Sequence, residues 1–266
     1  MGCQSSREDL SKEERAIMLM EDQLEFFKNT CKIVDLNFRK YSSNGSINAN
    51  QWSDITKSLG IKTRNCYQCP KVEEFYERHR TSNGDYRIKP LLTLGILMSS
   101  GTSRQKSKLL FEMLDPTNSK ELRKEVIEEM LGYILDVCIN DLPALVSNQT
   151  YPPVSEFKVR SYVQMLVDCR EAAKEKLLHI FLNGNPKEKE AVTLHEFQEV
   201  FHDETNARLF FPHGVRHFVL KNGHDVHKLE HKLRKMQEDN FGTIEDKKEN
   251  VENLGTAEDR KETENK

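Results

Sequence analysis

KYSSNGSINANQ, residues 40–51, is the first of four twelve-residue segments that share one frame and decide the fold. The other three are HRTSNGDYRIKP (79–90), DPTNSKELRKEV (115–126) and NPKEKEAVTLHE (185–196), and we name the four segments loops one to four. An apolar residue stands at the eighth place of every loop, and these residues are Ile47, Tyr86, Leu122 and Val192. Another apolar residue stands four places before each loop, and these are Leu36, Phe75, Phe111 and Phe181. A frame repeated in this way indicates an internally repeated structural unit.

The sequences on both sides of the loops read as amphipathic helices. Stretches such as QLEFFKNTCKIVDLNF and EVIEEMLGYILDV carry apolar residues at helical spacing. An apolar residue also follows each loop directly, and these are Trp52, Leu91, Ile127 and Phe197. A helix, a twelve-residue loop and a second helix form the plan of an EF-hand. Because one such unit cannot bury its apolar face alone, we expect the units to pair, with the eighth residues of paired loops forming a short β-bridge.

Two stretches resemble a known family. LTLGILMSSGTSRQKSKLLFEMLD (92–115) is similar to the link between the second and third hands of neuronal-calcium-sensor and calcineurin-B-like proteins, including its Ser-Gly-Thr turn. VTLHEF (192–197) resembles the exit of their fourth hand. The resemblance covers roughly residues 20–205 and the start of the chain. It implies an all-α fold of two pairs of EF-hand-like helix–loop–helix motifs, with an extra C-terminal helix and a disordered tail.

The frame also predicts how the chain is divided. An acylated N-terminal segment occupies residues 1–20, and the first EF-hand-like pair occupies residues 21–100. The second pair spans 101–212 and contains an inserted loop at about 140–156, where turn-forming residues separate loops three and four. A C-terminal helical extension is expected at 213–240. The segment 241–266 has few apolar residues and mixed charge, which is typical of a disordered tail.

The loops are poor in calcium ligands. Calcium needs six or more oxygen ligands, normally including several carboxylates and a bidentate Glu at the twelfth place. Loops one and two offer no carboxylate at the ligand places, although Gly45 and Gly84 keep the glycine that turns the chain. The weak candidates in loops three and four are Asp115, Thr117, Ser119, Glu121, Asn185 and Glu196. We therefore expect no cofactor at sensor affinity, and low-affinity calcium at loop three stays an open alternative.

The chain begins with MGCQSS, which fits a lipidation signal. Gly2 becomes the acceptor for myristate when Ser6 completes the Met-Gly-x-x-x-Ser/Thr pattern. A single myristoyl chain holds a protein at a membrane only weakly, and the thiol of Cys3 is placed to carry palmitate as the second anchor. This signal predicts a protein of the cytoplasm and of the cytoplasmic face of a membrane.

Composition and motifs exclude several functions. The formal net charge of −3 over 266 residues provides no basic field for nucleic acid, so no nucleic-acid partner is expected. No apolar run approaches the length of a membrane span. The sequence shows no nucleotide-binding loop, nucleophile elbow or pair of catalytic carboxylates, which predicts a protein that is not an enzyme.

Two smaller motifs have alternative interpretations. CYQC (66–69) is a lone Cys-x-x-Cys pair for which His79 is the one further zinc ligand in view, so a plain loop with two thiols is favoured. Several histidines gather near the C-terminus, at His213, His217, His224, His227 and His231. They indicate either an exposed or partner-binding helix or a metal-binding or pH-sensing patch.

These features together favour a lipid-anchored, EF-hand-like adaptor that binds a target protein helix in an apolar groove at a cytosolic membrane surface. The residues expected to form this groove or the core beside it are Phe27, Trp52, Phe75, Phe111 and Phe197. One alternative is a calcium sensor with a single irregular site. Another is a non-catalytic regulatory subunit of a phosphatase, kinase or channel, as the calcineurin-B resemblance implies.

Overall fold

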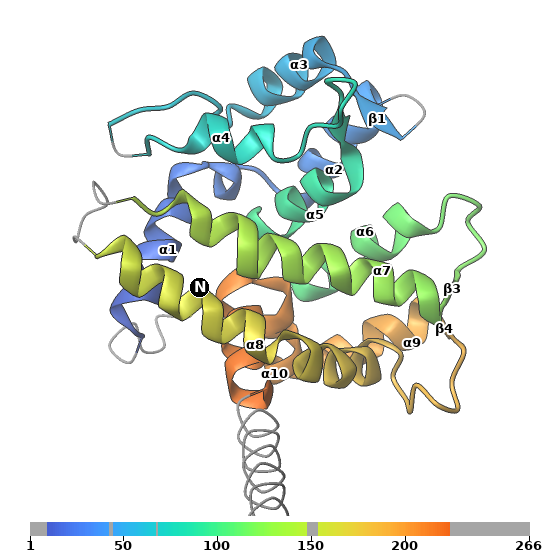
Figure 1. Cartoon of the computed structure of the whole chain (residues 1–266). Coiled ribbons are helices and arrows are strands. Elements are labelled where there is room, and N and C mark those ends of the chain that lie inside the picture. The colour runs from blue at the N-terminus through green and yellow to red at the C-terminus, as the bar shows by residue number, and fades with distance from the viewer. Residues whose placement is uncertain (1–9, 43–44, 68, 148–153, 224–266) are drawn as a thin grey trace, which may run out of the picture. The chain divides into compact units, whose positions relative to one another are not determined.

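The computed structural model describes residues 10–42, 45–67, 69–147 and 154–223. These residues belong to one compact, mostly helical unit (Figure 1). The lipidation residues Gly2 and Cys3, the second half of the predicted C-terminal extension and the predicted tail lie outside the described residues.

Helix–strand–helix units follow one another along the described chain, with one of the four loops inside each. The first two are α2 (Cys31–Tyr41), β1 (Ser46–Ile47) and α3 (Ala49–Leu59), then α4 (Val72–Glu77), β2 (Tyr86–Arg87) and α5 (Ile88–Met98). The next two are α6 (Ser103–Leu114), β3 (Glu121–Arg123) and α7 (Lys124–Leu135), then α8 (Glu156–Phe181), β4 (Ala191–Thr193) and α9 (Leu194–Glu199).

Further short elements surround these units. The chain enters through α1 (Lys12–Gln23) and the 3-10 turn η2 (Phe26–Lys28). After α7 it continues as the π-helical turn η3 (Asp136–Asp141) and the 3-10 turn η4 (Leu142–Leu145). After α9 come η5 (Val200–His202), α10 (Glu204–Ala207) and η6 (Arg208–Phe210), followed by helical residues 212–223.

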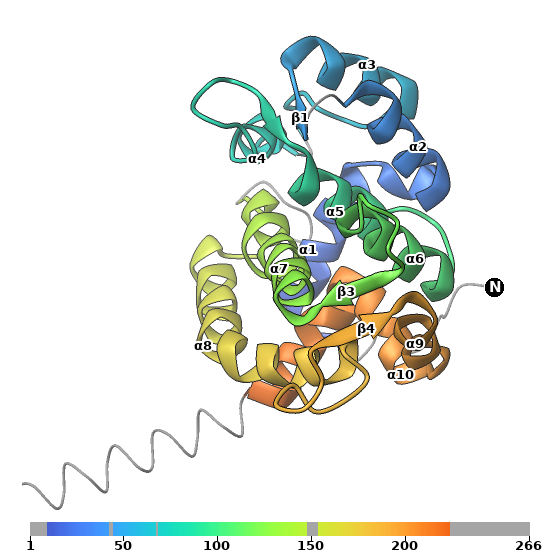
Figure 2. The same cartoon turned by 90° about the vertical axis from the view of Figure 1, so that its right-hand side faces the viewer.

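The strands pair as the sequence predicts. Strand β1 is antiparallel to β2 with Ile47 opposite Tyr86, and β3 is antiparallel to β4 with Leu122 opposite Val192. All four residues are buried, so each bridge carries its apolar side chains into the core. Figure 2 shows β3 and β4 running side by side between α7 and α9. The predicted pairing of the eighth residues is therefore confirmed, and so is a mainly helical fold.

The prediction for the helix before loop one is wrong in one residue. Leu36 is 65% exposed, and the side chain that enters the core is Phe38. Two residues rotate a helix by about 200°, so these two side chains point to opposite faces of α2. The core residue lies nine positions before its bridge residue Ile47, whereas the separation is eleven from Phe75 to Tyr86. The core residue Phe38 thus stands two positions closer to its bridge residue than the common frame predicts.

The structure also refines the segment boundaries. Helix α1 begins inside the expected acylated segment 1–20, and its Ile17 and Met20 belong to the core. Within the expected inserted loop at about 140–156, Leu142 and Leu145 are fully buried, while residues 148–153 lie outside the described chain. The start of the expected C-terminal extension is helical, over 212–223.

Candidate functional site

Loop four carries its own cation. The carboxylate of Glu196, at the twelfth place, accepts hydrogen bonds at Oε2 from the backbone N–H of Thr193 (2.9 Å) and from its hydroxyl (2.8 Å). Its Oε1 accepts a third bond from Lys189 Nζ at 2.9 Å. The backbone bond from Thr193 and the Lys189 ammonium lower the pKa of Glu196 to about 2. The one acidic ligand of this loop is thus already paired with a positive charge.

Other oxygens of loop four are also satisfied internally. The Oδ1 of Asn185, at the first place, accepts the backbone N–H of Lys187 at 3.0 Å. A second ammonium, from Lys124 at the start of α7, donates to the carbonyl of Pro186 at 3.1 Å. Lys189 and Lys124 thus donate hydrogen bonds to two oxygens of the loop, and their positive charges would repel a divalent cation.

Loop three is closed by its own carboxylate. Asp115 accepts the N–H groups of Ser119 (2.8 Å) and Lys120 (2.7 Å), together with the hydroxyls of Ser119 (2.9 Å) and Thr117 (3.2 Å). Desolvation raises the pKa of Asp115, but the hydrogen bonds from Ser119, Lys120 and Thr117 together outweigh it and the net pKa is lowered. In the same turn, Asn118 and Lys120 have φ 53° and 60°, a left-handed conformation that costs a non-glycine residue free energy. The candidate Glu121 lies on β3 opposite Thr193 and does not join Asp115 in these contacts.

Loop two is closed without any acidic group at its ligand places. Its first residue, His79, is buried and packs on the ring of Phe75 with centroids 5.6 Å apart. The Nε2 of His79 lies 3.7 Å from Asp141 Oδ2. Burial lowers the pKa of His79 to about 4 and raises that of Asp141 to about 6, so both groups are driven towards their neutral forms despite their proximity.

In loops one and four, the residues at the ninth and twelfth places cap the helix that follows the loop. Asn48 and Gln51 form a reciprocal capping box at the start of α3, and Thr193 and Glu196 form one at the start of α9. Each box satisfies backbone N–H groups that a helix start would otherwise leave unpaired. These two ligand places therefore have a structural role that needs no cation.

The residues predicted for a groove divide into two groups. Trp52, Phe75, Phe111 and Phe197 are buried in the core, and Phe27 is half exposed on η2. Trp52 packs against Tyr76 and Tyr86, with centroids 5.1 Å apart in both cases.

Near Phe197, the chain supplies its own filling side chains after α9. Phe201 lies 5.2 Å from the ring of Phe197 and 4.5 Å from the ring of Phe210. Residues from η5 and η6 therefore pack against Phe197, which lies in the core.

Sequence reasoning missed a buried ionic cluster. Arg216 is fully buried, and its guanidinium contacts Glu14 at 2.6 Å and Glu21 at 2.8 Å. It also donates to the carbonyl of Cys138 (3.1 Å), while the hydroxyl of Tyr162 donates to Glu14 (2.6 Å). A lone arginine inside the apolar stretch GVRHFVL (214–220) was a visible signal, but its partners lie about two hundred residues away in sequence.

A second buried cation ties α5 and α6 to the C-terminal turns. Lys106 on α6 is fully buried and donates to the carbonyls of Leu97 (2.7 Å) and Phe210 (3.2 Å). Its Nζ also lies 4.3 Å from the ring centroid of Phe211. Burial lowers the pKa of Lys106 to about 8.

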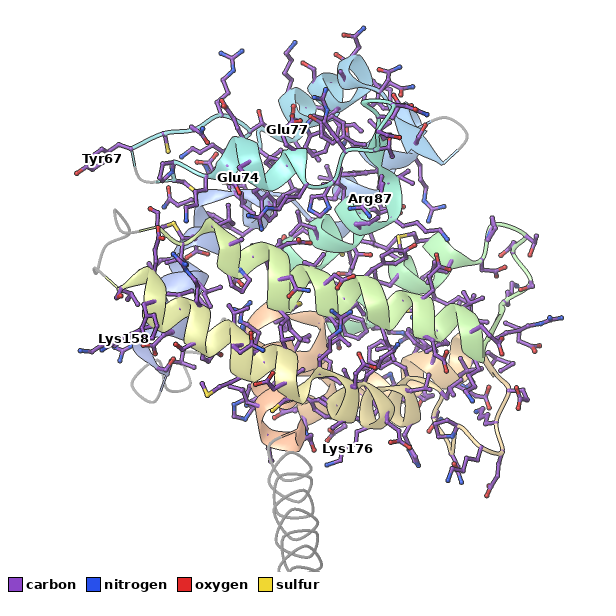
Figure 3. All side chains as sticks on the ribbon, in the orientation of Figure 1. Tyr67, Glu74, Glu77, Arg87, Lys158 and Lys176 are labelled. Carbon is purple, nitrogen blue, oxygen red and sulfur yellow. The ribbon has the colours of Figure 1, made fainter. Side chains whose placement is uncertain are left out.

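The Cys-x-x-Cys motif forms a tight turn. Cys66 and Cys69 exchange two backbone hydrogen bonds and both thiols are free. Tyr67 at the tip points away from the ribbon (Figure 3) and is largely exposed.

No group of three or more His, Cys, Asp or Glu side chains suited to a metal gathers within the described ranges. His213 and His217 lie on the helical residues 212–223, and the remaining histidines of the predicted patch lie outside the described chain.

The comparisons add no relative. No family model matches the sequence, and no curated protein matches it. Among the helices that the structure describes, none has the length and apolar character needed to cross a bilayer. The function of the loops is therefore inferred from their residues and their geometry.

Proposed function

We propose that this protein is a lipid-anchored, EF-hand-like adaptor that binds a target helix at a cytosolic membrane surface without high-affinity calcium. It is non-catalytic, and its loops act as structural connectors between paired helices. The observation that carries the proposal is the ion pair inside loop four, where Lys189 Nζ lies 2.9 Å from the closing carboxylate of Glu196.

The EF-hand-like assignment is supported by the two loop pairs. In each pair, the eighth residues face one another across a short antiparallel bridge, and the residue directly after the loop enters the core. The buried residues after the loops are Trp52, Leu91, Ile127 and Phe197. This is the arrangement expected of helix–loop–helix units that bury their apolar faces in pairs.

The absence of high-affinity calcium is supported by the chemistry of the donor set. A sensor loop gathers six or more oxygens, including several carboxylates. Loop four offers one carboxylate, which Lys189 already neutralises, and loop three offers Asp115, whose oxygens accept four internal hydrogen bonds. The residues present do not fit calcium at sensor affinity. A calcium ion would have to displace the groups that donate hydrogen bonds to Asp115 and Glu196, and the ammonium groups of Lys124 and Lys189 would repel it.

Calorimetric titration with calcium tests this part of the proposal. The full chain is expected to show no saturable binding below about 10 μM, the weak limit of sensor hands. The triple variant Asn185→Asp/Lys187→Asp/Lys189→Asp supplies carboxylates at places one, three and five and is expected to gain binding. Lys189→Met is the matched control, because it removes the ammonium without adding a ligand and should gain little. A wild-type dissociation constant below 10 μM would favour the sensor alternative at loop three.

The anchoring and adaptor parts need a cellular test. Affinity purification of the acylated protein from membranes, in calcium and in chelator, is expected to recover the same partners in both conditions. Gly2→Ala should release the protein from membranes, and unchanged membrane association would refute the anchoring part. Stable co-purification with one phosphatase, kinase or channel would favour the regulatory-subunit alternative.

A further inference from the structure

Helix α2 presents an apolar face to solvent. Ile33 is 46% exposed and Leu36 is 65% exposed, and they lie three residues apart on one side of the helix. Phe27, in the turn just before α2, is 50% exposed. The opposite side of α2 enters the core, through Cys31, Val34 and Phe38. The exposed side chains of Ile33 and Leu36 therefore do not contribute to the core packing of α2.

Basic residues border this apolar face. Lys32 stands four residues before Leu36, and Lys40 stands four residues after it, so both are neighbours of Leu36 on the helix surface. Segment 27–41 carries four cations against the single carboxylate of Asp35. Arg39 pairs with Asp35 at 2.8 Å and Lys28 pairs with Glu25 at 3.1 Å, so the positive charge of this face is carried by Lys32 and Lys40.

We propose that the outer face of α2, together with Phe27, docks onto an anionic lipid bilayer. Apolar side chains bordered by lysines are the arrangement of a helix that lies in a membrane interface, with the apolar groups among acyl chains and the cations at the headgroups. Each lysine or arginine near an anionic leaflet adds attraction that salt screens. Ile33 and Leu36 protrude from a helix whose neighbours pack on its other side, which suits a bilayer better than a groove-bound peptide.

This face lies within reach of the expected acyl anchor. Helix α1 has twelve residues and a length of about 18 Å, and it ends four residues before Phe27. The nine residues that precede the described chain span at most about 30 Å. An acyl chain at Gly2 and the α2 face can therefore meet one bilayer, although the α2 proposal does not require acylation. Testing it on unacylated protein separates its failure from failure of the proposed function.

The test is sedimentation of full-length, unacylated Gly2→Ala protein with vesicles of phosphatidylcholine alone or with 30% phosphatidylserine. We expect binding that requires phosphatidylserine and weakens with salt. In the same background, Ile33→Ser/Leu36→Ser should lower the partition coefficient by about 10-fold or more. Lys32→Glu/Lys40→Glu should lower it by a similar factor on the anionic vesicles. Circular dichroism spectra matching the parent confirm that the variants fold.

A matched control removes the same kind of surface elsewhere. Phe157 is 75% exposed and Met165 is 50% exposed on α8. Lys158, the next residue after Phe157 in the sequence, is labelled in Figure 3. Phe157→Ser/Met165→Ser should leave vesicle binding unchanged. The proposal is overturned if the parent protein does not prefer anionic vesicles, or if the α8 variant loses as much binding as the α2 variant. It is also overturned if the α2 variant binds vesicles normally and instead loses a protein partner.

Discussion

Replacing Arg216 by Met should expose how strongly the buried ionic cluster stabilises the fold. The guanidinium lies against the carboxylates of Glu14 and Glu21, which are each less than a tenth exposed. Burial, together with the neighbouring charge of Glu14, raises the pKa of Glu21 even though Arg216 opposes the shift. Without Arg216, both carboxylates would remain buried with no cation beside them.

The magnitude follows from the cost of neutralising these carboxylates. A glutamate with an ordinary pKa of about 4.3 takes up a proton at pH 7 at a cost of about 3.7 kcal/mol, which limits the penalty per carboxylate. Removing one partner of a buried ion pair costs about 3–5 kcal/mol in general. We therefore expect Arg216→Met to lower the free energy of unfolding by about 3–5 kcal/mol at pH 7.

The sign of the pH dependence is fixed by the same reasoning. Burial raises the folded-state pKa of Glu21, and removing the opposing Arg216 raises it further, so the destabilisation is complete above that folded pKa. It decreases as pH falls towards about 4.3, because the unfolded chain then also binds these protons. At pH 5.5 the limit per carboxylate is about 1.6 kcal/mol. The deficit of the variant should therefore be smaller at pH 5.5 than at pH 7.

Urea unfolding measures this deficit at pH 7 and pH 5.5, with the buried single tryptophan, Trp52, as the fluorescence reporter. The triple variant Glu14→Gln/Glu21→Gln/Arg216→Met is the control, because it removes the cation and both anions together. The triple variant should be less destabilised than Arg216→Met, because replacing all partners of a buried ion pair generally costs less free energy than removing one of them. A loss below 1 kcal/mol at pH 7, or a deficit that does not change with pH, would refute the reasoning.

Three further outcomes are expected. Thr193→Ala should lower the free energy of unfolding by about 1 kcal/mol because α9 loses its N-cap, whereas Thr193→Ser should keep most of it, as measured by urea unfolding. Between pH 8 and 10 the wild type should gain stability that Lys106→Met lacks, because the buried ammonium has a pKa of about 8 and releases its proton before the unfolded chain does. Asp141→Asn should lose about 2–3 kcal/mol on acidification from pH 6.5 to 4, because the folded state resists protonation of His79. The wild type should change less over this range, since Asp141, with a pKa of about 6, takes up a proton in the folded state and offsets the loss. Thermal unfolding at a series of pH values measures both effects.

The repeated frame could be predicted from the sequence because its apolar residues stand at fixed places within, or directly beside, each twelve-residue loop. Ile47 and Tyr86 each sit at a fixed place in their loops, so their pairing follows once the loops are aligned. Leu36 stands at the place that is buried before the other three loops, but it is exposed, and Phe38 on the opposite face of α2 is the core residue. Arg216 could not be matched to Glu14, since the two lie far apart in sequence and meet only through the packing of α1.

The candidate site was predictable in its residues but not in its contacts. Counting carboxylates already indicates that loop four is a poor calcium ligand set, and Lys189 is visible in the sequence. Its ammonium reaches Glu196 because the loop folds back from the fifth place to the twelfth, which no local pattern specifies. The same holds for Phe210, whose packing beside Phe201 depends on the course of the chain after α9.

The ionic cluster also bears on how an anchored protein of this kind would behave. Glu14 and Glu21 lie on α1, so Arg216 holds the helix that follows the proposed acylation signal against the helical residues 212–223. A ligand that displaced α1 would leave the fully buried Arg216 without its carboxylate partners, and an unpaired buried charge of this kind costs about 3–5 kcal/mol. A lipid anchor ahead of α1, as proposed, would therefore act on a helix that Arg216 ties to the helical residues 212–223.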